Sequence, residues 1–257
     1  MLAPREKSLT GGMYHSLLNL IGKSHFLPGE TQQPVGNSTI VCNVETMANN
    51  TTENRTNGQP HLVHLRHERD KGGNGYPTSP RGEYIFDNDT YKFLHYSTDR
   101  VLGIFNIGAH YHNFSHYKED MDTMLKLLVD LNRTQDFYMF RSTSPGHDGC
   151  EPKSSQFNWT HGTRITPLSS YNDYHIVSPH RFDWDKFEQY NHYTAELLHK
   201  RNIAGEFPVM HFLDIFNMTV LRHDAHGAPA DCLHLVAPGP VDWWNHLLFT
   251  YLQNLSI

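Results

Sequence analysis

The sequence predicts an α/β fold built on one doubly wound, mostly parallel sheet. Apolar or alternating runs near residues 91, 101, 136 and 208 alternate with amphipathic stretches near residues 9, 116, 184 and 241. A regular alternation of strands and helices is typical of parallel sheets. The 257 residues suit one α/β domain with a substantial core. No internal repeat or second boundary is evident, so we expect a single domain over residues 1–257.

The expected helices carry apolar residues at helical spacing. They cover residues 8–22, 116–131 and 183–201, and a last helix opens near residue 241. The expected strands are short runs bounded by polar or turn residues. They cover residues 84–86, 91–96, 101–105, 136–140 and 208–215.

Two segments lack such patterns. Residues 31–82 are polar and Gly-marked, which predicts an exposed insertion or long loop. Residues 151–182 are aromatic, rich in Ser and Thr and punctuated by Pro, which indicates a covering loop. Both segments are therefore expected to surround the sheet and not to build it.

The charge balance argues against a nucleic-acid partner. The formal net charge is -6, from 21 basic and 27 acidic residues, whereas nucleic-acid binding relies on a basic surface. No run of 18 apolar residues predicts a membrane span. The start of the chain also has no apolar region of the kind found in signal peptides.

Asn-x-Ser/Thr acceptors are more frequent than chance predicts. They occur at Asn37, Asn49, Asn50, Asn54, Asn88, Asn113, Asn132, Asn158, Asn217 and Asn254. Such an excess indicates a glycosylating compartment, so we expect the secretory pathway, either the Golgi lumen or the extracellular space. Without a signal sequence, we expect that N-terminal sequence is missing and that any membrane contact is made by an anchor there.

Three cysteines allow one disulfide and leave one thiol over. We expect Cys150 to pair with Cys232, because both lie beside candidate site motifs. Cys42 lies in the insertion rich in glycosylation acceptors. No cysteine or histidine spacing supports a metal site well enough, so we expect neither a metal nor another cofactor.

The most informative stretch is Asp231-Cys232-Leu233-His234 near the C-terminus, which we expect to lie in a loop marked by Gly and Pro. An aspartate three residues before a histidine can hold one imidazole nitrogen while the other faces a nucleophile. The longer pattern Leu-Arg-x-Asp-x-His, Asp-Cys-x-His, Pro-Gly and Asp-x-Trp-Asn-x-Leu-Leu spans residues 221–248. It resembles the C-terminal signature of the PC-esterase family, which includes plant trichome birefringence-like polysaccharide O-acetyltransferases. That family falls in the wider GDSL/SGNH hydrolase group, so the resemblance implies a three-layer α/β/α architecture.

The resemblance also implies a catalytic triad. Ser8-Leu9 and Ser16-Leu17 keep the family's spacing between its nucleophile motif and a second Ser-Leu pair. Ser8 is then the nucleophile, His234 its base and Asp231 the residue that orients the base. Two departures accompany the match: Glu6-Lys7 replace Gly-Asp, and Gly11 replaces an Arg. The family's first strand is also expected to be missing, because residues 1–7 are too polar to form it.

Two further segments resemble family motifs. The first, Asn106-Ile107-Gly108-Ala109-His110, is similar to the family's Asn-Thr-Gly-His-Trp with Ala109 inserted. It implies that Asn106 and Gly108 serve the oxyanion and that His110 contacts substrate. The second runs from Arg141 to His147 and resembles Arg-Thr-x-Ser-Pro-x-His, which implies that both of these end residues line the substrate pocket.

These features predict a serine-dependent acyl-ester enzyme. We expect an O-acetyltransferase or acetylesterase that acts on glycan hydroxyls through an acyl-enzyme, with an acyl donor and a glycan or other hydroxyl acceptor as partners. One alternative is a glycan-binding pseudo-enzyme of the same fold, motivated by the altered residues before Ser8. Another is a metal hydrolase that uses some of the 20 histidines, His110 and His112 among them.

Overall fold

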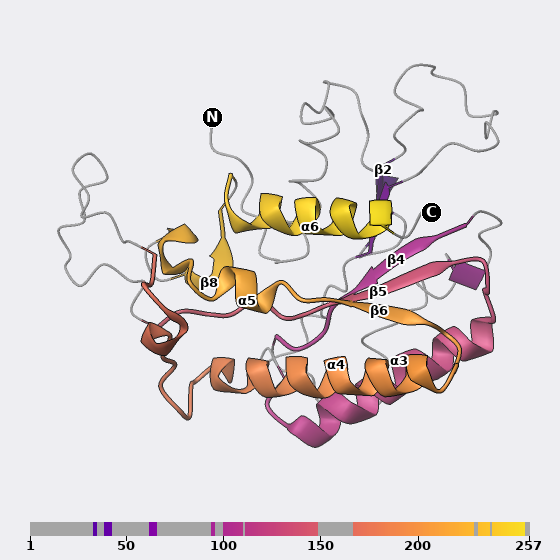
Figure 1. Ribbon diagram of the computed structural model, residues 1–257, viewed down its shortest axis with the longest axis horizontal. Helices are drawn as coiled ribbons and strands as arrows, with labels where there is room; N and C mark the ends of the chain where they lie inside the picture. The colour runs from indigo at the N-terminus through magenta and orange to yellow at the C-terminus, as the bar shows by residue number, and fades with distance from the viewer. Residues whose placement is uncertain are drawn as a thin grey trace, which may run out of the picture.

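The structure is a computed structural model that describes residues 94–95, 100–109, 111–148, 167–228, 231–236 and 238–254, and the backbone of three short strands before them. Figure 1 shows the elements along the chain. The strands are β1 (Gln33–Pro34), β2 (Thr39–Cys42), β3 (Leu62–Leu65), β4 (Leu102–Phe105), β5 (Phe137–Arg141), β6 (Met210–Leu213), β7 (His226–Ala228) and β8 (Asp231–Leu235). The helices are α3 (Phe114–Leu131), α4 (Phe187–Ile203), α5 (Phe216–Thr219) and α6 (Pro240–Asn254), with 3-10 turns η1 (Tyr171–Asp173), η2 (Trp184–Lys186) and η3 (His223–Ala225).

The central sheet is parallel, with the strand order β4-β5-β6. Ile104 lies opposite Met139, which lies opposite His211 on the other side. The middle strand, β5, is buried from Tyr138 to Arg141, because neighbours flank it and helices cover the sheet. The predicted strands at 101–105, 136–140 and 208–215 are thereby confirmed, with small shifts at their ends.

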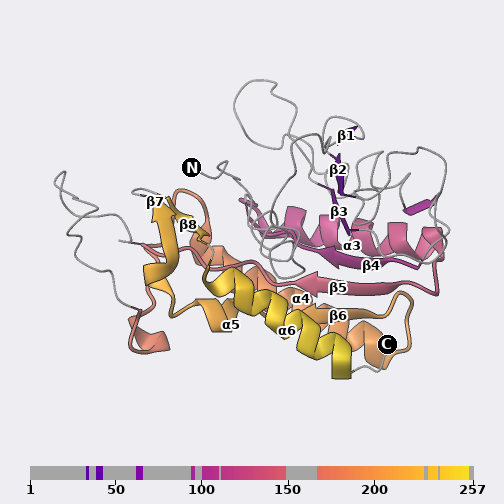
Figure 2. The same cartoon turned by 90° about the horizontal axis from the view of Figure 1, so that it is seen from above.

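Helices lie on both sides of this sheet (Figures 1 and 2). α3 connects β4 to β5, and α4 connects β5 to β6. Because parallel crossovers are right-handed and the strands advance in one direction, both helices reach the same face. α6 lies on the other face. The predicted helices at 116–131, at 183–201 and from 241 are confirmed, and an α/β fold follows.

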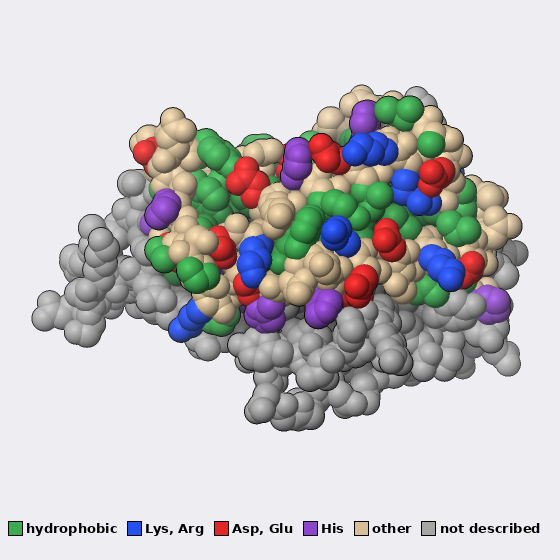
Figure 3. Space-filling view, turned by 90° about the horizontal axis from the view of Figure 1, so that it is seen from below, with side chains coloured by type: hydrophobic (Ala, Val, Ile, Leu, Met, Phe, Trp, Pro, Cys, Tyr) green, Lys and Arg blue, Asp and Glu red, His purple; other side chains and the backbone are tan. Residues whose placement is uncertain are grey.

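α3 and α4 pack through an aromatic contact. The rings of Tyr117 and Tyr190 stack with their centroids 4.5 Å apart, and both side chains are fully buried. The Tyr117 hydroxyl lies 2.6 Å from Oγ1 of Thr194, which satisfies both buried polar groups. On the outward face formed by these helices, acidic and basic side chains are interspersed among apolar ones (Figure 3).

α6 is anchored by Trp244, which has no exposed surface. Its indole Nε1 donates to Oγ1 of Thr219 at 2.8 Å, and the Arg141 guanidinium lies 5.2 Å from its ring centre. Burial lowers the pKa of Arg141 to about 9, so the group still carries its charge at neutral pH. Trp244 therefore joins the end of β5, α5 and α6.

The prediction of a loop around Asp231 and His234 is wrong. These residues lie on β8, which pairs antiparallel with β7 (Figure 2). The register places His226 opposite Leu235. Flanking Gly and Pro residues suggested a loop, whereas the strand depends on pairing between two short segments, which a local pattern does not reveal.

Two other expectations also change. Leu94 and His95 are helical, so the strand predicted at 91–96 is wrong there. A short alternating run places one apolar side chain inward in either structure, and buried Leu94 fits a helical turn equally well. The insertion at 31–82 contains the antiparallel sheet β1-β2-β3, which a loop prediction missed. The predicted helix at 8–22 and strand at 84–86 lie outside the described residues.

Candidate active site

Asp231 and His234 form a close pair on β8. The imidazole Nδ1 of His234 lies 2.9 and 2.8 Å from the two carboxylate oxygens of Asp231. The backbone N–H of His234 donates to the same carboxylate at 3.1 Å. Because a carboxylate only accepts, Nδ1 carries the proton and the neutral ring has its lone pair on Nε2. This is the tautomer that a general base requires.

The hydrogen bonds keep Asp231 ionised. Partial burial raises the pKa of the carboxyl, but the backbone and ring N–H groups of His234 outweigh it, and the net pKa lies below the ordinary value. Both side chains are partly exposed, at 44% for Asp231 and 31% for His234. Asp231 is thus negatively charged, and both side chains are partly accessible to solvent.

The carboxyl edge of the sheet brings most of the predicted site residues together. The loop after β5 is tied to β8, since the His147 N–H donates to the Cys232 carbonyl at 2.9 Å. The segment after β4 is tied to the end of β5, since Asn106 Nδ2 donates to the Arg141 carbonyl at 2.8 Å. Parallel strands end at one edge, where α/β sites form.

Asn106 and Gly108 pack tightly against Thr143. The Asn106 amide also approaches Thr143 Oγ1 at 3.4 Å, so its hydrogens point at protein acceptors. Thr143 Oγ1 donates to the Ile107 carbonyl at 2.9 Å. Gly108 has a φ of +143°, and a Cβ there would meet Thr143 Oγ1 at 2.1 Å. Glycine is needed at position 108 because other residues rarely adopt this positive φ and because a Cβ would collide with Thr143.

Arg141 and His147 are almost completely buried, whereas residues that line an open pocket expose part of their side chains. Arg141 has no exposed surface, and His147 is 1% exposed. The Arg141 guanidinium lies over Trp244, while the His147 ring contacts His226 and the Val220 carbonyl. Direct contact of these two residues with substrate therefore stays a prediction.

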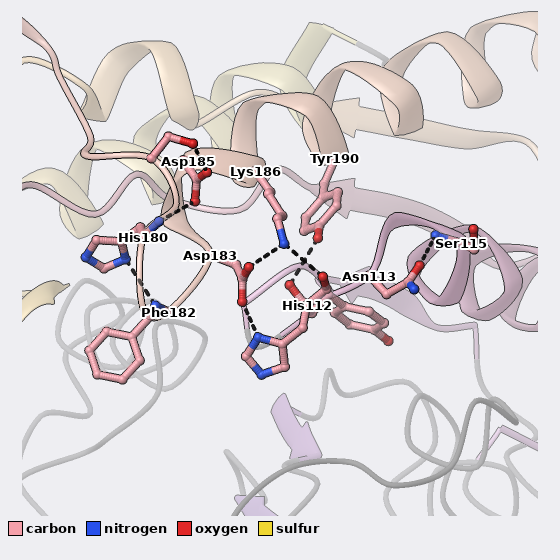
Figure 4. A network of polar contacts seen from close by, with 11 residues as sticks. His112, Asn113, Ser115, His180, Phe182, Asp183, Asp185, Lys186 and Tyr190 are labelled. Atoms are coloured by element: carbon pink, nitrogen blue, oxygen red, sulfur yellow. Dashed lines mark hydrogen bonds and ion pairs between the residues drawn. The ribbon is translucent and has the colours of Figure 1, made fainter.

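A second aspartate–histidine pair lies between the start of α3 and the start of α4 (Figure 4). His112 Nδ1 is hydrogen-bonded to the Asp183 carboxylate. Lys186 Nζ binds the same carboxylate and also donates to the His112 carbonyl at 2.8 Å. The sequence singled out His112 but missed Asp183, because 71 residues separate them and no local pattern connects the two.

Asp183 should make the protein more stable at neutral than at acid pH. Burial raises the pKa of its carboxyl, but Lys186 and His112 outweigh that and hold it below the ordinary value. Stability is then present above the unfolded pKa, about 3.9, and is lost as pH falls through the folded pKa. Asp183→Asn, which still tolerates the left-handed φ of 56°, should lower the free energy of unfolding at pH 7 by about 1–3 kcal/mol.

Thermal unfolding followed by circular dichroism between about pH 3 and pH 7 checks this expectation. The gap in Tm between Asp183→Asn and the unchanged protein should narrow as the pH falls. Asp130→Asn is the control, since Asp130 is exposed on α3. A gap that stays constant over this range would contradict the assignment.

Several predicted site residues lie outside the described residues, among them Ser8, His110 and Cys150. Cys232 is disulfide-bonded. Its partner is outside the described side chains, so the pairing with Cys150 stays a prediction. Of the glycosylation acceptors, the described ones are exposed, at Asn113, Asn132, Asn217 and Asn254.

The described part of the chain contains neither a metal-binding cluster nor a membrane-spanning helix. No cluster of three or more His, Cys, Asp or Glu in these ranges is arranged to hold a metal ion. No helix in the same ranges has the length and apolar character to cross a bilayer.

Sequence comparison adds two findings to this geometry. Residues 106–251, more than half of the chain, match the profile of PC-esterase, a GDSL/SGNH-like acyl-esterase family found in Pmr5 and Cas1p. The chain is also similar to Protein trichome birefringence-like 20 of Arabidopsis thaliana, with 24% identity over 176 residues. That match covers 61% of this chain and 33% of the relative, so the chain spans about a third of the length of the curated relative it matches.

Proposed function

The chain belongs to the PC-esterase family, and from this premise we propose that it is a serine-dependent acyl-ester enzyme that transfers or removes acetyl groups on glycan hydroxyls. The observation that carries the proposal is the Asp231–His234 pair, whose ring presents Nε2 as a base. Family membership supports acyl-ester chemistry in general. The choice of an acetyl group and of a glycan acceptor rests on the resemblance to the trichome birefringence-like proteins.

In this mechanism Ser8 is the nucleophile. Its hydroxyl oxygen attacks the acyl carbonyl while His234 Nε2 takes the hydroxyl proton. The C–O bond to the donor alcohol breaks, the alcohol leaves with that proton, and an acyl-enzyme remains. A sugar hydroxyl or water then gives its proton to His234 and attacks the acyl carbon, the bond between Ser8 and the acyl group breaks, and Ser8 takes the proton back from His234. Asp231 stabilises the imidazolium formed in both halves.

The remaining roles follow the motif match. Asn106 would stabilise the oxyanion after turning one amide N–H away from its longer contact, the 3.4 Å approach to Thr143 Oγ1. The glycine at 108 would keep the backbone beside that amide close to the substrate. We assign His110 to substrate contact, and Arg141 and His147 to shaping the pocket from beneath, in keeping with their burial.

The proposal extends to architecture and location. A single domain over residues 1–257 with a three-layer α/β/α arrangement fits the helices seen on both faces of the sheet (Figure 1). The exposed acceptors at Asn113, Asn132, Asn217 and Asn254 support passage through the secretory pathway, with the Golgi lumen or extracellular space as the place of action.

Labelling by a serine-directed phosphonate probe tests the proposed function. The unchanged chain should be labelled, and labelling should be lost in both Ser8→Ala and His234→Ala, because the first removes the nucleophile and the second removes its base. Intact mass and tryptic mapping would place the adduct. Ser16→Ala is the matched control, since it removes the other serine of the repeated Ser-Leu spacing.

The result that would overturn the proposal is a folded chain that the probe does not label. A glycan-binding pseudo-enzyme would then be the better description. Labelling that persists in Ser8→Ala and disappears in Ser16→Ala would keep the enzyme and move its nucleophile.

A further inference from the structure

His226 contacts the backbone of His234, the candidate base. Its Nδ1 lies 3.0 Å from the carbonyl oxygen of His234. A carbonyl only accepts hydrogen bonds, so Nδ1 of His226 must carry a proton. The contact fixes His234 from its main-chain side, while Asp231 holds the ring from the other.

His147 lies on the far side of His226 and has a similar outer contact. Its Nε2 lies 2.8 Å from the carbonyl oxygen of Val220, so Nε2 must carry a proton as well. The His147 ring is almost fully buried, at 1% exposure. Its backbone N–H donates to the Cys232 carbonyl, and the burial of the ring together with its contact to Val220 leaves the side chain little freedom to turn.

The two rings meet through their other nitrogens. His147 Nδ1 and His226 Nε2 are 2.8 Å apart. A neutral imidazole has one N–H, and both rings already use it on a carbonyl. Two neutral rings would therefore direct two lone pairs at each other across a hydrogen-bond distance. One added proton turns this repulsion into an N–H···N bond, and the pair then carries one positive charge.

The surroundings of the pair act in both directions. Burial and, to a lesser extent, the ring of His223 lower the pKa of His147 and of His226, while the contacts with the Val220 and His234 carbonyls raise it, and the net pKa of each is about 4. Two carboxylates oppose this effect, since Asp224 raises the pKa of His147 and Asp231 raises that of His226. A proton between two lone pairs is also held more strongly than on either ring alone.

Further described residues surround the pair. The Tyr174 ring packs edge-on against His147 with centroids 5.6 Å apart. Arg222 binds Asp224 at 2.8 Å through Nε, which keeps that carboxylate ionised beside the pair. The Val220 and His234 carbonyls, already named, take the outer protons.

We propose that His226 is a positioning residue for His234 and that one proton, shared between the His226 and His147 rings, holds His226 in place. The inference rests on the proposed function, since it deepens the role of the same base. When the shared proton is present, His226 is bridged to His147 and fixes the His234 carbonyl. As the pH rises and the proton leaves, the rings repel and the hold on His234 loosens.

The proton itself can be observed without any activity. Correlation spectra of protein with 15N-labelled histidine, recorded from about pH 3 to about pH 8, report the protonation of each ring nitrogen. His147 Nδ1 and His226 Nε2 should titrate together in one step with intermediate shifts. In His147→Asn, whose amide nitrogen replaces Nδ1 and donates to His226 Nε2 without an added proton, His226 should stay neutral at the pH where the unchanged pair takes up its proton.

Kinetics test the positioning role. His226→Ala should lower kcat about 10²-fold through misplacement of the base, with KM changed less than about twofold. His226→Asn, whose amide nitrogen replaces Nδ1 as donor to the His234 carbonyl, should recover most of that loss. His192→Ala is the control, because its side chain is 75% exposed on α4.

The spectra and the kinetics can each contradict the proposal separately. Two rings that both stay neutral over the whole pH range would overturn the shared proton. A His226→Ala variant with unchanged kcat, or one that His226→Asn fails to improve, would overturn the positioning role. An unchanged protein without turnover on any ester would instead count against the proposed function, and the spectra would still decide the state of the pair.

Discussion

Asp231→Asn is expected to lower kcat for acyl transfer by about 10⁴-fold while the fold is kept. The carboxylate accepts the Nδ1–H of His234 through both oxygens. An amide can donate to Nδ1, so the variant favours the tautomer with its proton on Nε2, which cannot take a proton from a nucleophile. The loss should fall on kcat and kcat/KM alike, because the charged imidazole forms only along the reaction.

Initial rates with an activated acetyl ester measure this effect, and Asp130→Asn is the matched control. Asp130 is an exposed aspartate on α3, so it tests the loss of one carboxylate away from the site. Equal rates for the two variants would contradict the assigned role of Asp231. A Tm measurement on both separates a catalytic loss from a loss of fold.

Trp244→Ala is expected to lower the free energy of unfolding by about 3–5 kcal/mol, a large part of the stability of an ordinary domain. The substitution leaves a cavity where a fully buried indole was. It also removes the hydrogen bond to Thr219 and the ring beneath Arg141. A buried guanidinium without that ring faces a poorly packed site, which adds to the cost.

Equilibrium unfolding in urea, followed by far-ultraviolet circular dichroism, gives the measurement. Trp243→Ala is the control from the same helix turn, since Trp243 is 58% exposed and should cost less than about 1 kcal/mol. Trp244→Phe keeps most of the burial and loses only the N–H, so it remains measurable even where the alanine variant does not fold. Similar losses for the two alanine variants would show that α6 does not depend on Trp244.

The local pattern of the sequence was sufficient for the α/β class and for the main elements. Apolar residues recur every three or four positions in α3 and α4, and a continuous apolar run marks β5. These periods follow directly from helix and strand geometry, so they can be seen before any tertiary contact is known. The pairing of Asp231 with His234 was also visible, because only two residues separate them.

Tertiary structure decided what depends on distant residues. The pairing of β7 with β8 placed the candidate site on a hairpin. The contact between Asp183 and His112 and the contact between His147 and His226 join segments 71 and 79 residues apart. Hydrogen bonds of this kind form where separate elements pack together, and the spacing of residues within one element does not predict that packing. The sequence therefore predicted which residues would carry the proposed chemistry, and the packing of β5, β7 and β8 decided which side chains contact them.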